Sequence, residues 1–168
     1  MAYSFINTQI GLPPITDTQL AAEAASEGAQ LGFIAQAVDP TYGTGEFIYL
    51  KGLAATAVGT WVTYSADDNS TALLAANAIG PVAIAMSANL AGYYGWYQIS
   101  GKAVGKALTG YVDNALVYAT ATAGSVDDAV VAGDRVKLAL GASAVGTPSA
   151  GLAEFEIQRP FMDDATPA

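Results

Sequence analysis

The sequence contains neither cysteine nor histidine. Their absence excludes disulfides, thiolate nucleophiles, Ser-His-Asp triads and every metal site that needs sulfur or imidazole ligands. Enzyme mechanisms that depend on a cysteine or histidine side chain are therefore excluded. We therefore expect no enzyme activity, with no catalytic residues, no cofactor and no metal.

Charge is also scarce, and positive charge is the scarcest. Charged residues make up 12% of the 168 positions, and six Lys and Arg stand against fifteen Asp and Glu, for a net charge of -9. The first fifty residues contain no Lys or Arg. Because nucleic-acid backbones are bound by clustered basic side chains, we expect no nucleic-acid partner.

Long apolar runs are missing as well. No stretch approaches the roughly 18 uninterrupted apolar residues of a membrane span, and the first residues lack the pattern of a signal peptide. We expect no membrane partner. What the chain does have is 52% hydrophobic residues, 35 of its positions being Ala, and a length that suits one domain with its own core.

From about residue 30 onward, short segments alternate in hydrophobicity with a period of two, and Gly, Asn, Asp and Pro separate them. This pattern is typical of antiparallel β-strands. It predicts an all-β fold, an antiparallel β-sandwich or barrel that is jelly-roll-like. The expected strands are 31–38, 45–52, 60–65, 71–75, 81–87, 94–100, 102–108, 115–121, 134–140 and 153–159. Within 134–140, the alternation places Val136, Leu138 and Leu140 on the face opposite Arg135 and Lys137.

The first thirty residues differ from the rest. Isolated apolar residues stand among polar ones around Pro13-Pro14, which suits an extended arm. A short helix is expected after Thr16, which has capping-box spacing to Gln19, and Gly28 is expected to end it. The predicted organisation is an N-terminal arm over 1–30, a β domain over 31–158 and a C-terminal tail over 159–168.

An unusually dense aromatic cluster lies in "YYGWY" at 93–97. Alternation places Tyr94 and Trp96 on one face of a strand and Tyr93 and Tyr97 on the other. A strand in a two-sheet core needs only one apolar face, so something must cover the second. That cover is another part of this chain, another subunit or a sugar.

Three acidic pairs, at 67–68, 127–128 and 163–164, raise the question of a calcium site or a carboxylate hydrolase. Adjacent strand residues point to opposite faces, and acidic pairs in turns are usually solvated. The segment "DDNS" also lacks the ordered oxygen ligands of a calcium loop. We expect these pairs to be solvated turn residues.

The chain resembles a family of small head proteins of tailed bacteriophages, the capsid decoration or cement proteins. The resemblance lies in Asp39 and Tyr42 ahead of "GEFIYLKG" at 45–52, in "GTWVTY" at 59–64, and in "GWYQISGKA" at 95–103. It covers about residues 31–140. It implies a β-sandwich or β-barrel on the outer surface of the virion capsid, made in the host cytoplasm, which bridges neighbouring major capsid subunits as a homo-oligomer.

The small-residue composition favours self-association, with a trimer preferred and a dimer possible. The expected capsid or subunit contacts are the apolar residues of the arm and two tyrosines of the aromatic cluster: Phe5, Ile6, Ile10, Leu12, Ile15, Tyr93 and Tyr97. For the arm, the alternative is an edge strand of its own domain. For the whole protein, the alternative is a carbohydrate-binding β-sandwich module of a phage particle, with Tyr93, Tyr97 or Trp96 stacking on the sugar.

Overall fold

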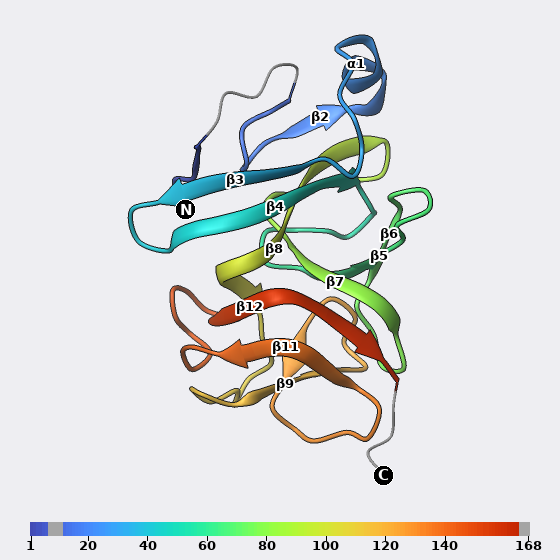
Figure 1. Cartoon of the computed structure of the whole chain (residues 1–168). Helices are drawn as coiled ribbons and strands as arrows, with labels where there is room; N and C mark the ends of the chain where they lie inside the picture. The colour runs from blue at the N-terminus through green and yellow to red at the C-terminus, as the bar shows by residue number, and fades with distance from the viewer. Residues whose placement is uncertain (7–11, 165–168) are drawn as a thin grey trace.

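The structure is a computed structural model that describes residues 1–6 and 12–164 (Figure 1). The described residues form 12 strands and one short helix, α1 (Ala21–Ser26). The strands are β1 (Ser4–Phe5), β2 (Thr18–Leu20), β3 (Ile34–Asp39), β4 (Gly43–Lys51), β5 (Trp61–Tyr64), β6 (Thr71–Leu73), β7 (Ile79–Ala85), β8 (Tyr93–Lys106), β9 (Leu116–Ala119), β10 (Val126–Asp127), β11 (Arg135–Gly141) and β12 (Leu152–Asp163).

All these strands pair antiparallel in one bent sheet, with the order β1-β3-β4-β8-β7-β12-β11-β9-β10 along its main path. Within the described residues, the sheet does not close on itself. The predicted all-β fold is therefore confirmed, and the open sheet corresponds to the sandwich rather than to the barrel.

Strand β8 joins the two ends of the molecule. The part before Gly101 pairs with β4, and the part around and after it pairs with β12. Gly101 has a φ of +98°, which only glycine adopts readily, and the chain bends there. The strands predicted separately at 94–100 and 102–108 are therefore one long strand.

Three apolar clusters fill the folds of this sheet. The lower cluster packs Trp61 edge-on against Phe155, at 5.0 Å between ring centroids, with side chains from β7, β9, β11 and β12 around them. The arm cluster includes Phe47, Tyr49 and Trp96. The inner cluster contains Ile48, Leu50, Val62, Ala83, Ala85, Tyr97 and Ile99. Strand β4 thus contributes to two clusters, because its alternate residues face opposite sides.

The first thirty residues belong largely to the domain. Strand β1 pairs with β3, and β2 pairs with β8. The short helix occurs where it was expected and is followed by Gly28 at a φ of +72°. Its N-cap is Leu20, without a side-chain cap, so Thr16 does not play the predicted capping role. At the other end, β12 continues to Asp163 and includes the first residues of the predicted tail.

Candidate interaction surfaces

The aromatic cluster is core on its first face. Trp96 is fully buried, and its indole Nε1 donates a hydrogen bond to the carbonyl oxygen of Pro13, at 2.9 Å. Its ring lies 5.4 Å from that of Phe5 and 5.1 Å from that of Tyr49, measured between centroids. The cover of this face is thus the N-terminal segment of the same chain.

The second face of the aromatic cluster is also covered by the same chain. Tyr97 is 0% exposed and packs in the inner cluster, and burial raises its pKa. Its hydroxyl donates a hydrogen bond to the carbonyl oxygen of Lys51, at 3.3 Å. The expectation that Tyr97 contacts a partner is therefore wrong, and neither Tyr97 nor Trp96 has a free ring on which a sugar could stack. Tyr93 is half-buried beside β2.

The apolar residues of the arm divide into buried and exposed ones. Ile15 is only 1% exposed, and Phe5 and Leu12 pack against the arm cluster. Ile15 is therefore a core residue rather than a contact for a partner. This part of the arm buries its apolar side chains within its own domain, because the aromatic face of β4 and β8 needs a cover. Ile6 is 50% exposed, and Ile10 lies outside the described residues.

Ile6 forms an exposed apolar surface together with β3. The backbone N–H of Ile6 donates to the carbonyl oxygen of Gln36, at 3.0 Å, and this places Ile6 in register with the outward residues of β3. The two apolar ones, Ile34 and Val38, are exposed while Ala35 and Ala37 between them are buried. We call Ile6, Ile34 and Val38 the arm surface.

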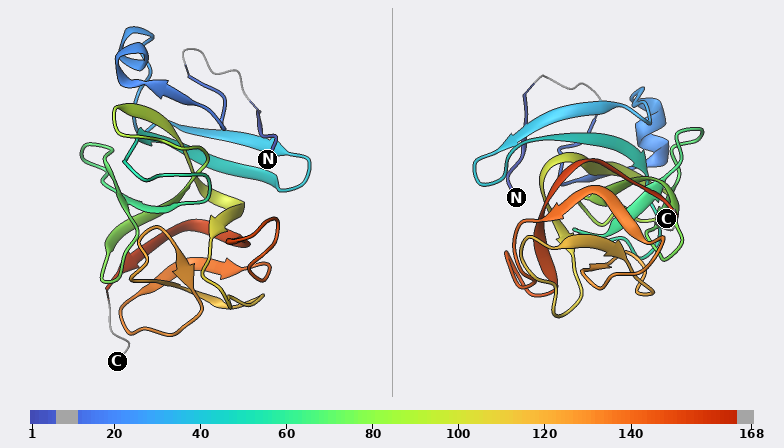
Figure 2. Two further views of the ribbon diagram at one scale, coloured as in Figure 1. Left: turned by 180° about the vertical axis from the view of Figure 1, so that it is seen from behind. Right: turned by 60° about the horizontal axis from the view of Figure 1, so that its bottom comes forward.

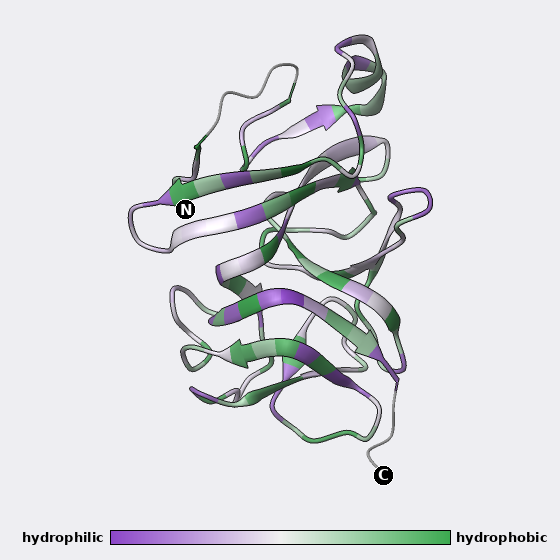
Figure 3. Ribbon diagram, viewed as in Figure 1, coloured by the Kyte–Doolittle hydropathy of each residue, from purple (hydrophilic) through white to green (hydrophobic). Residues whose placement is uncertain are grey.

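A second exposed apolar surface lies at the other end of the sheet, on β9 and β11. Leu116, Leu138 and Leu140 are 38%, 56% and 38% exposed, and Leu140 lies directly opposite Leu116. Together they line a depression of about 320 Å³. We call these three leucines the leucine surface. Figure 3 shows apolar segments along both β3 and β11.

The leucine surface corrects the predicted alternation of segment 134–140. The pairing of β11 with β12 shifts between Lys137 and Ala139, and Leu138 at this bulge has a φ of +60°. Beyond the bulge it is Ala139 that faces the core, at 8% exposed, and Leu140 turns outward. A bulge arises from pairing with a distant strand, so nothing within "RVKLALG" itself indicates it.

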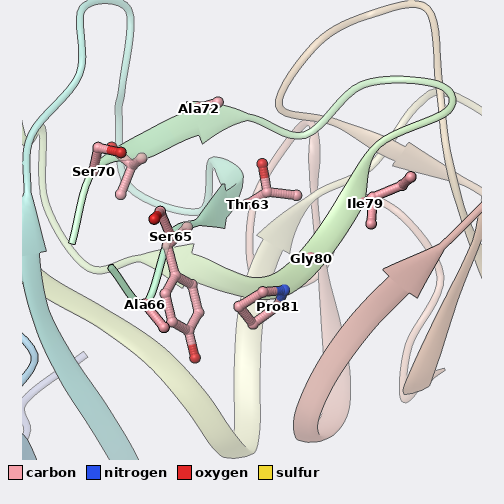
Figure 4. Close-up of a pocket in the computed structure, with 10 residues that line it drawn as sticks. Thr63, Ser65, Ala66, Ser70, Ala72, Ile79, Gly80 and Pro81 are labelled. Atoms are coloured by element: carbon pink, nitrogen blue, oxygen red, sulfur yellow. The ribbon is translucent and has the colours of Figure 1, made fainter. Parts of the chain in front are cut away.

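A further depression is formed by β5, β6 and β7 (Figure 4). It is lined by small, hydroxyl-bearing and apolar residues: Thr63, Tyr64, Ser65, Ala66, Ser70, Thr71, Ala72, Ile79, Gly80 and Pro81. Two of the hydroxyls already bond elsewhere, since Ser70 donates to Asp68 at 2.7 Å and Thr71 donates to the carbonyl oxygen of Lys51 at 3.0 Å. None of these residues is Asp, Glu, Lys or Arg, and the one titratable side chain is that of Tyr64, whose pKa is raised by burial.

The acidic pairs have structural partners. Asp68 accepts hydrogen bonds from the side chain and backbone of Ser70, which lower its pKa to about 2, with a smaller effect from Lys51. Asp128 accepts a hydrogen bond from the backbone of Val112, at 3.0 Å, and Asp163 pairs with Lys137. Across residues 1–6 and 12–164, no group of three or more acidic side chains is placed to hold a metal ion.

Comparison with known proteins adds no identification. No family model matches the chain, and no curated protein or solved structure is significantly similar to it. Among the described residues, no helix is both long and apolar enough to cross a membrane.

Proposed function

We propose that this protein is a structural component of a bacteriophage head, a decoration protein that binds the outer capsid surface and stabilises contacts between major capsid subunits. In this proposal it works as a homo-oligomer in the virion and has no catalytic role. The proposal rests on the sequence resemblance together with the surfaces described above.

The observation that carries the proposal is the placement of the two exposed apolar surfaces. The arm surface lies on β3 and on Ile6, which directly follows β1. The leucine surface lies on β9 and β11, near the opposite end of the strand order. In Figures 1 and 2, β3 lies in the upper part of the molecule, and β9 and β11 lie in its lower part. A protein that bridges subunits needs separated contact surfaces of this kind, whereas a ligand-binding module needs one concave site.

We assign the arm surface to the major capsid protein. Fully burying an Ile or Val side chain contributes about 1.5 to 3 kcal/mol, and these residues are already about half covered, so each adds roughly 1 kcal/mol. A single contact of this size is weak. Repeated copies on a shell would raise the overall affinity through multivalency, provided that the subunits are linked to one another.

Two of the three aromatic residues proposed to stack on a sugar are not accessible to a ligand. Trp96 and Tyr97 are fully buried, and both of their polar groups bond to the chain's own backbone. The remaining candidate, Tyr93, is half-buried. We therefore retain only the decoration function.

The test is co-sedimentation with heads assembled from the major capsid protein alone. We expect the wild-type protein to pellet with the heads and to raise the temperature at which they dissociate. The double substitution Ile34→Thr and Val38→Thr keeps β-branched side chains but removes apolar surface, so it should weaken binding by about ten-fold.

The matched control is Ile79→Thr, because Ile79 is 72% exposed and lies on β7, outside both surfaces. This control should bind heads like the wild type. Wild-type protein that does not pellet with heads would refute the decoration function. Equal binding by the double variant would refute the role of the arm surface.

A further inference from the structure

The leucine surface carries two unpaired charges of opposite sign at its two ends. Arg135 begins β11 and is exposed, and Glu156 lies opposite Leu140 on β12 and is exposed as well. Both side chains line the same depression as the three leucines. Neither forms an ion pair within residues 1–6 and 12–164, where four other ion pairs occur.

The neighbouring charges do not neutralise these two. Lys102 lies opposite Glu156 on β8, but its Nζ atom bonds to Glu154, at 2.6 Å. Lys137 follows Arg135 on the same strand and pairs with Asp163. The surface therefore presents an apolar centre with one free positive charge at one end and one free negative charge at the other.

We infer that the leucine surface is the self-association surface of this protein and that it joins two copies about a two-fold axis. A two-fold axis through the surface near Leu138 exchanges its ends. It lays Arg135 of each copy against Glu156 of the other and the leucines against one another. A surface that is complementary to itself in this way forms an isologous dimer, which closes after two copies.

The backbone at Leu138 supports this assignment. A φ of +60° is unfavourable for leucine, and the side chain is nevertheless 56% exposed in the single chain. Asn or Gly would suit the conformation better, and either would remove apolar surface from water. Leucine at this position is thus unfavourable for the isolated chain, and contact with a second copy compensates for it.

This inference specifies the self-association that the proposed function includes, and it selects the dimer over the trimer that the composition favoured. The dimer also suggests how the protein could bridge capsid subunits. Two copies joined at their leucine surfaces carry their arm surfaces at the far ends, where each can contact a different capsid subunit.

The test measures the mass of the purified full chain by sedimentation equilibrium and needs no capsid. We expect a dimer for the wild type. Leu138→Asn should weaken the dimer by about ten-fold or more, because it removes a central apolar contact. The same substitution should leave the denaturant midpoint of the monomer unchanged or raised, because Asn tolerates a positive φ. Ile79→Thr is the control and should leave the dimer intact.

Charge reversal tests the two-fold geometry itself. Arg135→Glu and Glu156→Arg should each weaken the dimer by placing like charges opposite one another, and the double reversal should restore it. A wild-type monomer at all concentrations, a trimer, or a dimer that Leu138→Asn does not weaken would overturn the inference. A wild-type protein that is monomeric in solution, and whose leucine substitutions weaken only its binding to heads, would overturn it as well. Failure of capsid binding would leave the dimer result unaffected.

Discussion

Two isoleucines of the N-terminal segment show how residues of one type can have different roles. Ile15 is 1% exposed in the arm cluster, and Ile6 is 50% exposed beside β3. Both isoleucines lie among polar residues of the arm, so the sequence pattern predicts the same role, a contact with a partner, for each. The difference arises because only Ile15 reaches the aromatic face of β4 and β8.

Substitution with alanine should separate these roles. Ile15→Ala should lower the free energy of unfolding by about 2 to 4 kcal/mol, because it leaves a cavity beside buried aromatic rings. Ile6→Ala should change it by less than about 0.5 kcal/mol. Urea denaturation of both variants provides the measurement. Equal stabilities for the two would show that the arm cluster does not depend on the N-terminal segment.

A second residue-scale prediction concerns alkaline pH. Burial raises the pKa of Tyr49 from 10.0 to about 12, and its hydroxyl donates to the Oε1 atom of Gln19 at 2.9 Å. Below pH 10 this phenol is protonated in both the folded and unfolded chains. Between pH 10 and 12 only the unfolded chain gains from ionisation, so the free energy of unfolding should fall as the pH rises through this range.

Tyr49→Phe should reduce this fall, because phenylalanine has no proton to lose. At pH 8 the variant should differ from the wild type by only about 1 kcal/mol, through the lost hydrogen bond to Gln19. Urea denaturation at several pH values between 8 and 12 gives both quantities. An unchanged alkaline slope would mean that other groups cause the loss.

At the scale of elements, much of the β-structure could be predicted from alternation. Phe155 and Ile157 are buried while Glu156 and Gln158 between and beyond them are exposed, as the sequence indicates. The same alternation occurs in β4, where Phe47 and Tyr49 lie in the arm cluster and Ile48 and Leu50 lie in the inner cluster. Alternation identifies the two faces of a strand, because it depends only on neighbouring residues.

Alternation does not identify what covers each face, since that depends on pairing between distant strands. The contact of Pro13 with Trp96, the bulge at Leu138 and the continuity of β8 through Gly101 all arise in this way. Sequence analysis therefore located the aromatic cluster but wrongly predicted that Tyr97 contacts a partner. It gave no indication of the leucine surface, which the bulge creates.

The bend in β8 allows a test at this scale. A Cβ atom at Gly101 would lie 2.6 Å from the carbonyl oxygen of Thr44, and the residue has a φ of +98°. Gly43 also has a positive φ, +74°, but nothing lies within 4 Å of its Cβ position. Gly43→Ala should therefore cost only the conformational penalty, about 1 kcal/mol.

Gly101→Ala should cost at least about 1 kcal/mol more than Gly43→Ala, because the backbone of β4 must move to admit the methyl group. Guanidinium denaturation of the two variants measures the difference. If the two costs are the same, β4 does not pack against the bend as closely as described.

At the scale of the whole molecule, the N-terminal segment covers one face of the core. Residues 2–28 contain Tyr3 and Ile15, both buried in the arm cluster, and β2, which pairs with β8. Deleting them would expose Phe47, Tyr49 and Trp96 to water. The deleted chain should lose the cooperative thermal transition of the wild type and bind a hydrophobic dye.

The control for this deletion is Ile6→Ser, which changes an exposed residue of the same segment and should melt like the wild type. Calorimetry and dye binding on the three proteins make the comparison. A truncated chain that melts cooperatively near the wild-type temperature would show that the segment is an appendage rather than part of the core.

The position of β12 in the chain has a consequence for synthesis on the ribosome. The inner cluster is made of residues between Ile48 and Ile99, and the aromatic face of the arm cluster is complete with Trp96. These parts can assemble early. The lower cluster needs Phe155, Ile157 and Met162, and the second half of β8 has its partner only in β12. Until β12 emerges, the nascent chain must therefore carry Trp61 without Phe155 and the second half of β8 with an unpaired edge. In this form neighbouring chains would most readily associate wrongly.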